Sequence, residues 1–327
     1  MAIFIRSNPS SYFLPIFGTG VDGDVVISSN TDLPSTLNGD IVYKNYRNLT
    51  VNSGCTLSVS NRCKGLWIRV RGTLVLNGTI SMTGKAPTLG SNGSDLYLCY
   101  SDIKVPAAGA AGGAGGTVLG AVGNSGGNGS NGSCGGGGAG GCEKQFSGAT
   151  SGAGAAGFSS GGGSGGSGSC STGSYSMTAS GKPGGAYGGD GGAAVTCTGG
   201  QDTWSGAGAG GNGGTGLQTV GNGSPGAGGI LIIMANRIEG TGSLKSQGTS
   251  GGHGAIAGSY SSSAGGGGGS GGGSITLYYL SSSADWPMNV SGGAGGSGAG
   301  GAGNGGAGGA GSYRYYSMQQ LASHTRI

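Results

Sequence analysis

GLWIRVRGTLVLNGTISMTG, residues 65–84, is the stretch of the sequence that most strongly indicates a fold. Apolar and polar residues alternate along it, and Asn-Gly separates two apolar runs, which is the pattern of β-strands joined by a tight turn. Residues 229–248 and 273–292 can be laid over it, because each reads strand, short turn, strand and then glycine. Recurrence of one such unit is typical of a solenoid, whose turns stack and bury a continuous core. We therefore predict an all-β, β-solenoid-like fold with almost no α-helix.

Glycine divides the chain into two regions. It supplies 88 of 327 residues, and only 8% of all residues are charged, which is far from the composition of an ordinary globular domain. Residues 1–106 hold 11 glycines and 15 charged residues, whereas residues 107–311 hold 77 glycines and nine charged residues. We expect a strand-rich, solenoid-like domain over residues 24–106 and a different kind of module after it.

The glycine-rich region has a period of three. From Gly120 to Gly141 every third residue is glycine, and the run from Gly292 to Gly301 repeats this spacing. A three-residue period fits the polyglycine II helix, which has no internal hydrogen bonds, so its amides must bond sideways to neighbours. We predict that residues 107–311 form a packed bundle of such helices, interleaved with solenoid rungs at residues 229–248 and 273–292.

A glycine content this high also occurs in collagen and in flexible linkers. Collagen is excluded, because eight prolines are too few for a triple helix. A flexible Gly/Ser linker is the alternative for residues 107–229. The scarcity of charge there argues against disorder, since disordered chains generally stay open through net charge.

Charge and hydropathy exclude several classes of partner. The net charge is +4 without a basic run, so we expect no nucleic-acid binding. No stretch approaches the roughly 20 apolar residues of a membrane-spanning helix. The first 20 residues do not form a basic segment followed by a continuous apolar one, so export by a signal peptide is not expected.

Apparent catalytic motifs arise from the glycine content. Gly206-x-Gly208-x-x-Gly211 follows no strand, and Gly162-x-Ser164-x-Gly166 lies in a low-complexity run. The eleven acidic residues are scattered, whereas glycoside hydrolysis needs a carboxylate pair at a defined separation. We predict no enzyme activity and no cofactor; a polysaccharide-cleaving solenoid is the enzymatic alternative.

Seven cysteines are present, none in a C-x-x-C pair, and only two histidines accompany them, so no metal site is predicted. Four cysteines are candidates for disulfides: Cys134 and Cys142, in the tract of period three, and Cys170 and Cys197, which flank the next glycine tract. The alternative is that they are small buried hydrophobes. Because seven is odd, at least one thiol stays free or bonds to another chain.

Several pieces occur in a recognisable order: DGDVVISSNT from Asp22, NLTVNSGCTLSVS from Asn48, GTLVLNGTISMTG from Gly72, and then a glycine tract. In this order they resemble the glycine-rich fibre and receptor-binding proteins of tailed phages. In composition and period, residues 107–311 are similar to the polyglycine-sandwich tip adhesins of T-even-like long tail fibres. In those adhesins, parallel polyglycine helices carry loops that bind surface receptors. The strand-rich first hundred residues and the cysteines depart from that pattern.

The resemblance implies a virion protein, a tail fibre or fibre-tip adhesin that binds a host receptor, either a glycan or an outer-surface protein. Residues 1–23 would then attach to the virion, and residues 312–327 would be an aromatic C-terminal tail. Other fibre or tail proteins are the expected partners, and any homo-oligomer is expected to be a trimer. Assembly would take place in the host cytoplasm. A virion component without receptor contact is the alternative: a collar or whisker fibre, a baseplate appendage or a capsid decoration.

Breaks in the glycine runs supply candidate receptor contacts. Polyglycine helices must reverse, so polar and aromatic breaks should fall at the bundle ends, where rings offer contact area at little entropic cost. The candidates are Phe146, Tyr175, Met177, Gln201, Asp202, Trp204 and Tyr260. The plainer alternative is that rings such as Phe146 and Trp204 only cover the flank of the bundle.

Overall fold

The computed structural model describes residues 16–87, 96–97, 104–105, 218–219, 226–253, 255–256, 269–283, 285–297 and 306–317. Within these residues all regular secondary structure is β-strand and no helix occurs, so the predicted all-β class is confirmed. The strands are β1 (Asp24–Ile27), β2 (Thr31–Leu33), β3 (Val42–Tyr46), β4 (Asn48–Val51), β5 (Thr56–Val59), β6 (Leu66–Leu76), β7 (Thr79–Ser81), β8 (Leu96–Tyr97), β9 (Lys104–Val105), β10 (Gln218–Thr219), β11 (Ile230–Glu239), β12 (Ser243–Lys245), β13 (Ala255–Ile256), β14 (Ser274–Ser282), β15 (Met288–Asn289) and β16 (Ser312–Ser317).

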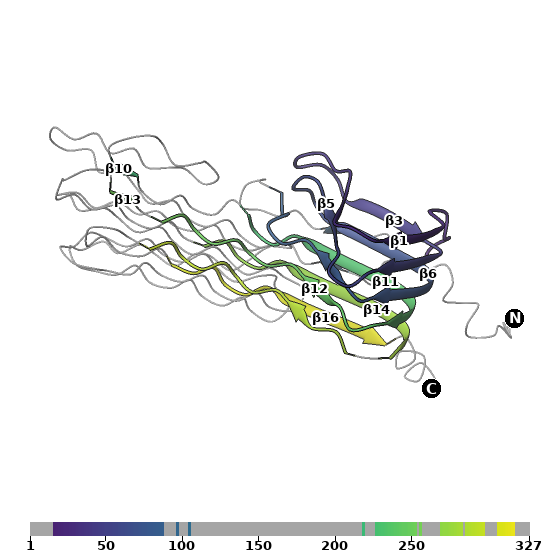
Figure 1. The fold of residues 1–327 in the computed structure, drawn as a ribbon. Coiled ribbons are helices and arrows are strands. Elements are labelled where there is room, and N and C mark those ends of the chain that lie inside the picture. The colour runs from purple at the N-terminus through teal and green to yellow at the C-terminus, as the bar shows by residue number, and fades with distance from the viewer. Residues whose placement is uncertain are drawn as a thin grey trace, which may run out of the picture.

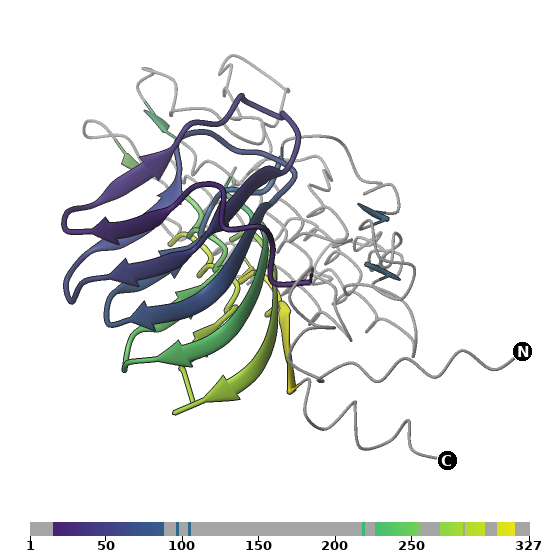
Figure 2. The same cartoon turned by 90° about the vertical axis from the view of Figure 1, so that its right-hand side faces the viewer.

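Two parallel sheets account for most of these strands. The first sheet has seven strands in the order β1-β4-β6-β11-β14-β16, with β3 beside β4 on β6. The second has five strands in the order β2-β5-β7-β12-β15. The chain alternates between the two, so each strand of the second sheet follows one of the first. Figure 2 shows the strands of the first sheet stacked from β1 to β16. β8 with β9, and β10 with β13, form separate antiparallel pairs.

The three segments that align in sequence lie side by side, because β6 pairs with β11 and β11 pairs with β14. One irregularity interrupts the first pairing. Val70 pairs with Ala235. Three residues later Thr73 pairs with Arg237, only two residues further along β11. β6 therefore has one extra residue here, a β-bulge that includes Gly72.

The main core lies between the two sheets. Leu57, Ile80 and Leu244 occupy facing positions on β5, β7 and β12, and each is at most 1% exposed. Opposite them, inward-pointing aliphatic side chains of the first sheet complete one hydrophobic cluster. Full burial of a side chain of this size contributes about 1.5–3 kcal/mol to stability. Stacking of equivalent residues from successive strands thus makes a large contribution to stability.

The outer face of the first sheet carries a second apolar cluster. Trp67 of β6 is fully buried there beside apolar residues of β11, and the Arg69 guanidinium lies 4.3 Å from the Trp67 ring centroid. Phe17 packs into the same cluster and is 1% exposed. Phe17 and the half-buried Ile16 therefore pack against the sheet. Residues 1–15 of the predicted attachment segment lie outside the described residues.

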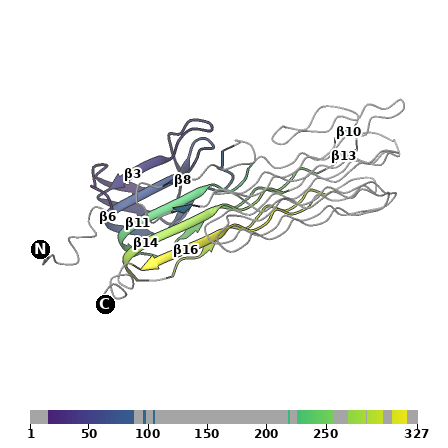
Figure 3. The ribbon, with the colours of Figure 1, turned by 180° about the vertical axis from the view of Figure 1, so that it is seen from behind.

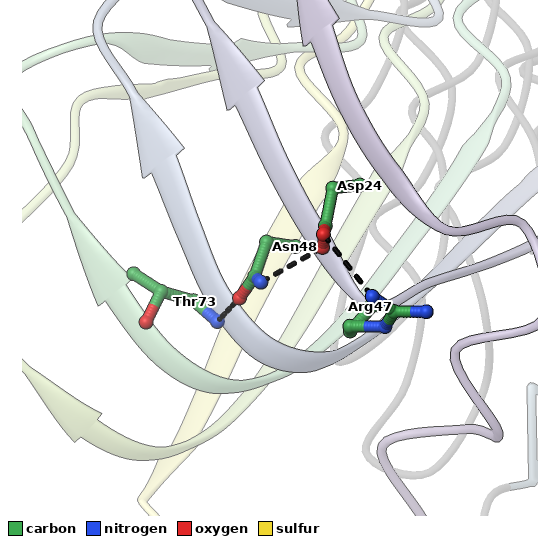
Figure 4. A network of polar contacts seen from close by, with 4 residues as sticks. All are labelled: Asp24, Arg47, Asn48 and Thr73. Atoms are coloured by element: carbon green, nitrogen blue, oxygen red, sulfur yellow. Dashed lines mark hydrogen bonds and ion pairs between the residues drawn. The ribbon is translucent and has the colours of Figure 1, made fainter.

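A polar network crosses three strands near the bulge in β6 (Figure 4). The Asn48 carboxamide donates to Asp24 Oδ1 at 2.9 Å and accepts from the Thr73 backbone N–H at 2.8 Å. Arg47 forms an ion pair with Asp24 at 3.3 Å. An added Cβ at Gly72 would overlap the Asn48 side chain, so glycine leaves the space that the carboxamide fills.

Candidate functional site

Short segments, most of them rich in glycine, leave and re-enter the strands at one end of the sheets, and we call them legs. In chain order they are leg 1 (82–87), leg 2 (226–229), leg 3 (246–253), leg 4 (269–273), leg 5 (290–297) and leg 6 (306–311). Legs 1, 3 and 5 follow strands of the second sheet, and legs 2, 4 and 6 lead into strands of the first. Figures 1 and 3 show the green and yellow legs running side by side from the same end of the strands.

Leg 4 forms hydrogen bonds with four other legs. The N–H groups of Gly269 and Gly272 donate to leg 6, and those of Ser270 and Gly273 donate to leg 3. The carbonyl of Gly271 accepts from leg 2, and that of Ser270 accepts from leg 5. A β-strand pairs with two neighbours in one plane, so the legs are not an extension of either sheet. Their donor partners repeat every third residue.

Direct backbone contact between legs requires glycine. An added Cβ at Gly272 would overlap the carbonyl oxygen of Val290, and one at Gly293 would overlap that of Thr249. Similar overlaps with neighbouring backbone occur at Gly228, Gly248, Gly269, Gly273, Gly292, Gly296, Gly308 and Gly311. These neighbours are main-chain atoms that cannot rotate away, so no residue with a side chain fits.

Exposure along the last two legs also has a period of three. In leg 5, Gly293 and Gly296 are buried, whereas Ala294 and Ser297 are exposed. Leg 6 repeats the pattern over residues 306–310. Over residues 293–297 and 306–310, side chains thus occupy the outward position of each triplet, and glycine occupies the inward one.

A second candidate surface lies on β16, the last strand of the first sheet. Ile68, Ile233 and Leu277 pair in register on β6, β11 and β14, and all three are buried. The same row continues on β16 to Tyr315, which is 60% exposed. The adjacent row ends at Tyr313, which is 50% exposed. The hydrophobic rows of the core therefore end in two accessible tyrosine rings.

These rings line an open groove of about 370 Å³. Among the described strands, the second sheet ends at β15, one strand before the first sheet ends at β16. The inner face of β16 thus borders the groove instead of facing another strand of the described part. Its lining residues are Leu277, Tyr279, Asp285, Trp286, Pro287, Met288, Tyr313 and Tyr315.

A polar hollow adjoins the groove and shares Tyr279 and Asp285 with it. The rest of its lining is Leu280, Ser281, Ser282, Ser283 and Ser317. Burial, with the nearby Asp285 carboxylate and the Tyr315 phenol, raises the pKa of Tyr279 further above neutrality, where a tyrosine phenol is protonated in any case. Trp286 is held in place because its indole N–H donates to the carbonyl of Gly240 at 3.1 Å.

Sequence reasoning missed this groove. Tyr313 and Tyr315 belong to the segment that the sequence suggested was an aromatic tail, whereas the structure places residues 312–317 in β16. The alternation of Ser-Tyr-Arg-Tyr-Tyr-Ser was the available signal, since a period of two indicates a strand.

The predicted receptor contacts lie outside the described residues. They are Phe146, Tyr175, Met177, Gln201, Asp202, Trp204 and Tyr260. The candidate disulfide partners Cys134, Cys142, Cys170 and Cys197 also lie outside them. Both sets stay predictions. In the described part, Cys55 and Cys63 are free thiols, and burial raises the pKa of Cys63.

In the described ranges, no three His, Cys, Asp or Glu residues gather as metal ligands would. The same ranges hold no helix with the length and apolarity needed to cross a membrane. Comparisons with protein-family models, curated proteins and solved structures gave no match for this chain.

Proposed function

We propose that this chain is a structural protein of a phage virion, acting as a tail fibre or a fibre-tip adhesin that binds a host surface receptor. The observation that carries this proposal is the cross-bonding of leg 4 to four other legs. Legs that bond in several directions support an extended, rigid module, which suits a protein that must project from a particle.

We further propose a β-solenoid that continues into a bundle of polyglycine II helices. The alternation of the chain between two parallel sheets supports the solenoid, since each pair of strands then forms one rung. The three-residue period of bonding and of exposure supports the polyglycine II conformation, which has three residues per turn. Reversals of such a bundle would present the breaks in the glycine runs, which is where we place the receptor contacts.

A structural virion component without receptor contact is the second candidate. The exposed positions of legs 5 and 6 favour it, because residues such as Ala294, Ser297 and Ala307 offer little chemistry for recognition. A collar or whisker fibre, a baseplate appendage or a capsid decoration needs stiffness and a bland surface only.

Two measurements test the proposal. Gold-labelled antibodies against the chain, viewed on intact particles by electron microscopy, should mark the tail or its fibres. Particles that carry Tyr175→Ala, Trp204→Ala and Tyr260→Ala together should then adsorb poorly to host cells. Particles with Tyr43→Ala, which removes an exposed ring elsewhere, are the matched control and should adsorb normally.

The outcomes separate the candidates. Label on the tail with normal adsorption by the triple variant favours the structural component without receptor contact. Absence of label from purified particles would overturn the virion assignment.

A further inference from the structure

We propose that the groove beside β16 binds a neutral saccharide, through residues other than the predicted receptor contacts at the glycine breaks. The groove juxtaposes exposed tyrosine rings, one carboxylate and a serine-rich hollow. The inference stands independently of the virion assignment, since it concerns ligand chemistry at described residues.

The exposed rings of the groove match the apolar faces of a sugar. A sugar ring has faces of C–H bonds and a periphery of hydroxyl groups, so its binding site needs flat apolar surface beside hydrogen-bonding groups. Tyr313 and Tyr315 supply rings that are half or more exposed. Aromatic rings of this kind give rigid contact area at low entropic cost, with a polar tip for hydrogen bonding.

Polar groups beside the rings match the hydroxyl groups of a sugar. Asp285 and Tyr279 border both the groove and the serine-lined hollow. A ligand that packs on the tyrosine rings would therefore lie beside these two side chains. The carboxylate accepts hydrogen bonds from ligand hydroxyls, and the protonated phenol of Tyr279 can donate one. Hydroxyls of Ser281 and Ser317 both donate and accept, which matches a ligand rich in hydroxyl groups.

Size and charge narrow the ligand. A volume of about 370 Å³ is near the lower end of the roughly 300–1,000 Å³ typical of ligand pockets. A short saccharide unit therefore fits the groove better than a large ligand. Asp285 is the only carboxylate among the described lining residues, and it disfavours anionic sugars such as uronates and sialic acids by like-charge repulsion.

A protein strand is the competing occupant. Such a strand would extend the second sheet beyond β15, but β15 has only two residues and follows Pro287, which lacks an N–H. A short edge preceded by proline offers few hydrogen bonds for strand addition. The structure therefore favours a small polyol over a peptide at this place.

Trp286 has a supporting part in this site. Its indole is 8% exposed and its N–H is engaged by Gly240, so the ring forms a fixed wall and is not free to donate to a ligand. The accessible tyrosines, and not this tryptophan, are the residues to test.

The experiment uses the purified full chain. Binding is screened on an array of neutral and acidic glycans, and the dissociation constants of neutral hits are measured by calorimetry. We expect neutral glycans to bind, and Tyr313→Ala with Tyr315→Ala to weaken binding by at least about tenfold. Asp285→Asn should weaken neutral ligands and reduce discrimination against uronate-bearing ones. Tyr43→Ala, an exposed ring on another part of the first sheet, should bind like the wild type.

Two binding results would contradict the saccharide site. Absence of any neutral-glycan binding by the folded chain would overturn the inference, as would equal affinity of the double tyrosine variant and the wild type. Sedimentation of the same variants covers the protein alternative: if the wild type self-associates, binds no glycan and dissociates when both tyrosines are removed, the groove is a protein interface. None of these results depends on particle labelling or adsorption, so failure here leaves the virion proposal standing, and the reverse also holds.

Discussion

The Asn48 carboxamide oxygen accepts a hydrogen bond from the backbone N–H of Thr73 at 2.8 Å, at the bulge where β6 has one residue more than its neighbours. The same side chain donates to Asp24, so one residue links three successive strands of the first sheet. A bulge leaves a backbone donor without its regular partner. Asn48 supplies the replacement, and Gly72 leaves room for it.

Asn48→Ala should lower the free energy of unfolding by about 1–2 kcal/mol, because both hydrogen bonds are lost and Thr73 N–H must find water. Urea denaturation followed by circular dichroism measures this. Arg47→Ala in the same network is the control: its ion pair with Asp24 is more than half exposed, so a change below about 1 kcal/mol is expected. Equal effects of the two substitutions would contradict the bridging function of Asn48.

Gly293→Ala should disrupt the legs, since the new methyl group would overlap the main chain of Thr249. We expect a loss on the order of 3 kcal/mol or more, seen as a lower melting temperature and rapid cleavage by a nonspecific protease. Ala294→Ser changes the next residue at an exposed position and should stay within about 0.5 kcal/mol of the wild type. Similar protease sensitivity of both variants would argue that the legs are not packed.

Leu244→Ala tests the stacked core, because this side chain is 1% exposed between Ile80 and Met288 in neighbouring strands. Removal of a buried leucine side chain costs about 2–5 kcal/mol. Met288→Ala truncates the end of the same row, where the side chain is only half-buried, and should cost clearly less. A larger loss for Met288→Ala would show that the row does not end at β15 as described.

Cys55 should react with iodoacetamide faster than Cys63 in the folded protein. Burial raises the pKa of Cys63, which lowers its thiolate fraction at neutral pH, and it also blocks access. Mass spectrometry of peptides from native and denatured samples gives both labelling rates, and the difference should vanish on unfolding. Faster labelling of Cys63 would be incompatible with its burial.

The same unreduced peptides address the predicted disulfides of Cys134, Cys142, Cys170 and Cys197. Linked peptides would support cross-linking of the glycine tracts. If only free thiols are found, these cysteines are better described as small buried side chains.

The sequence was a good guide where local pattern and pairing coincide. Residues 66–76 and 230–239 alternate or run apolar, as strands do. Thr79 pairs with Ser243 in the structure, and the same two residues correspond when residues 229–248 are laid over residues 65–84. The bulge at Gly72 could not be predicted, because an extra residue is defined only by comparison with the neighbouring strand. Local alternation on β6 carries no record of the length of β11.

The groove shows a second limit of local pattern. Tyr313 and Tyr315 looked like part of a tail because they follow a long glycine run, and nothing nearby indicates that the first sheet extends one strand further than the second. Their rings are exposed because, among the described strands, the second sheet ends at β15 and leaves β16 without a strand opposite it. This exposure becomes visible only when the rows that pass through Leu66 and Ile68 are followed across the sheet to β16.

The triplet pattern of legs 5 and 6 constrains how such a chain can change in length. Leg 6 bonds to leg 5 at Gly293 and Val290, so both legs return to equivalent positions only after whole triplets. In the proposed polyglycine II conformation, which has three residues per turn, loss of one residue would turn every later side chain by about a third of a turn, and the outward position of Ala294 would face its neighbours. Insertions and deletions should therefore survive as blocks of three codons, made in matched pairs on the outgoing and returning legs.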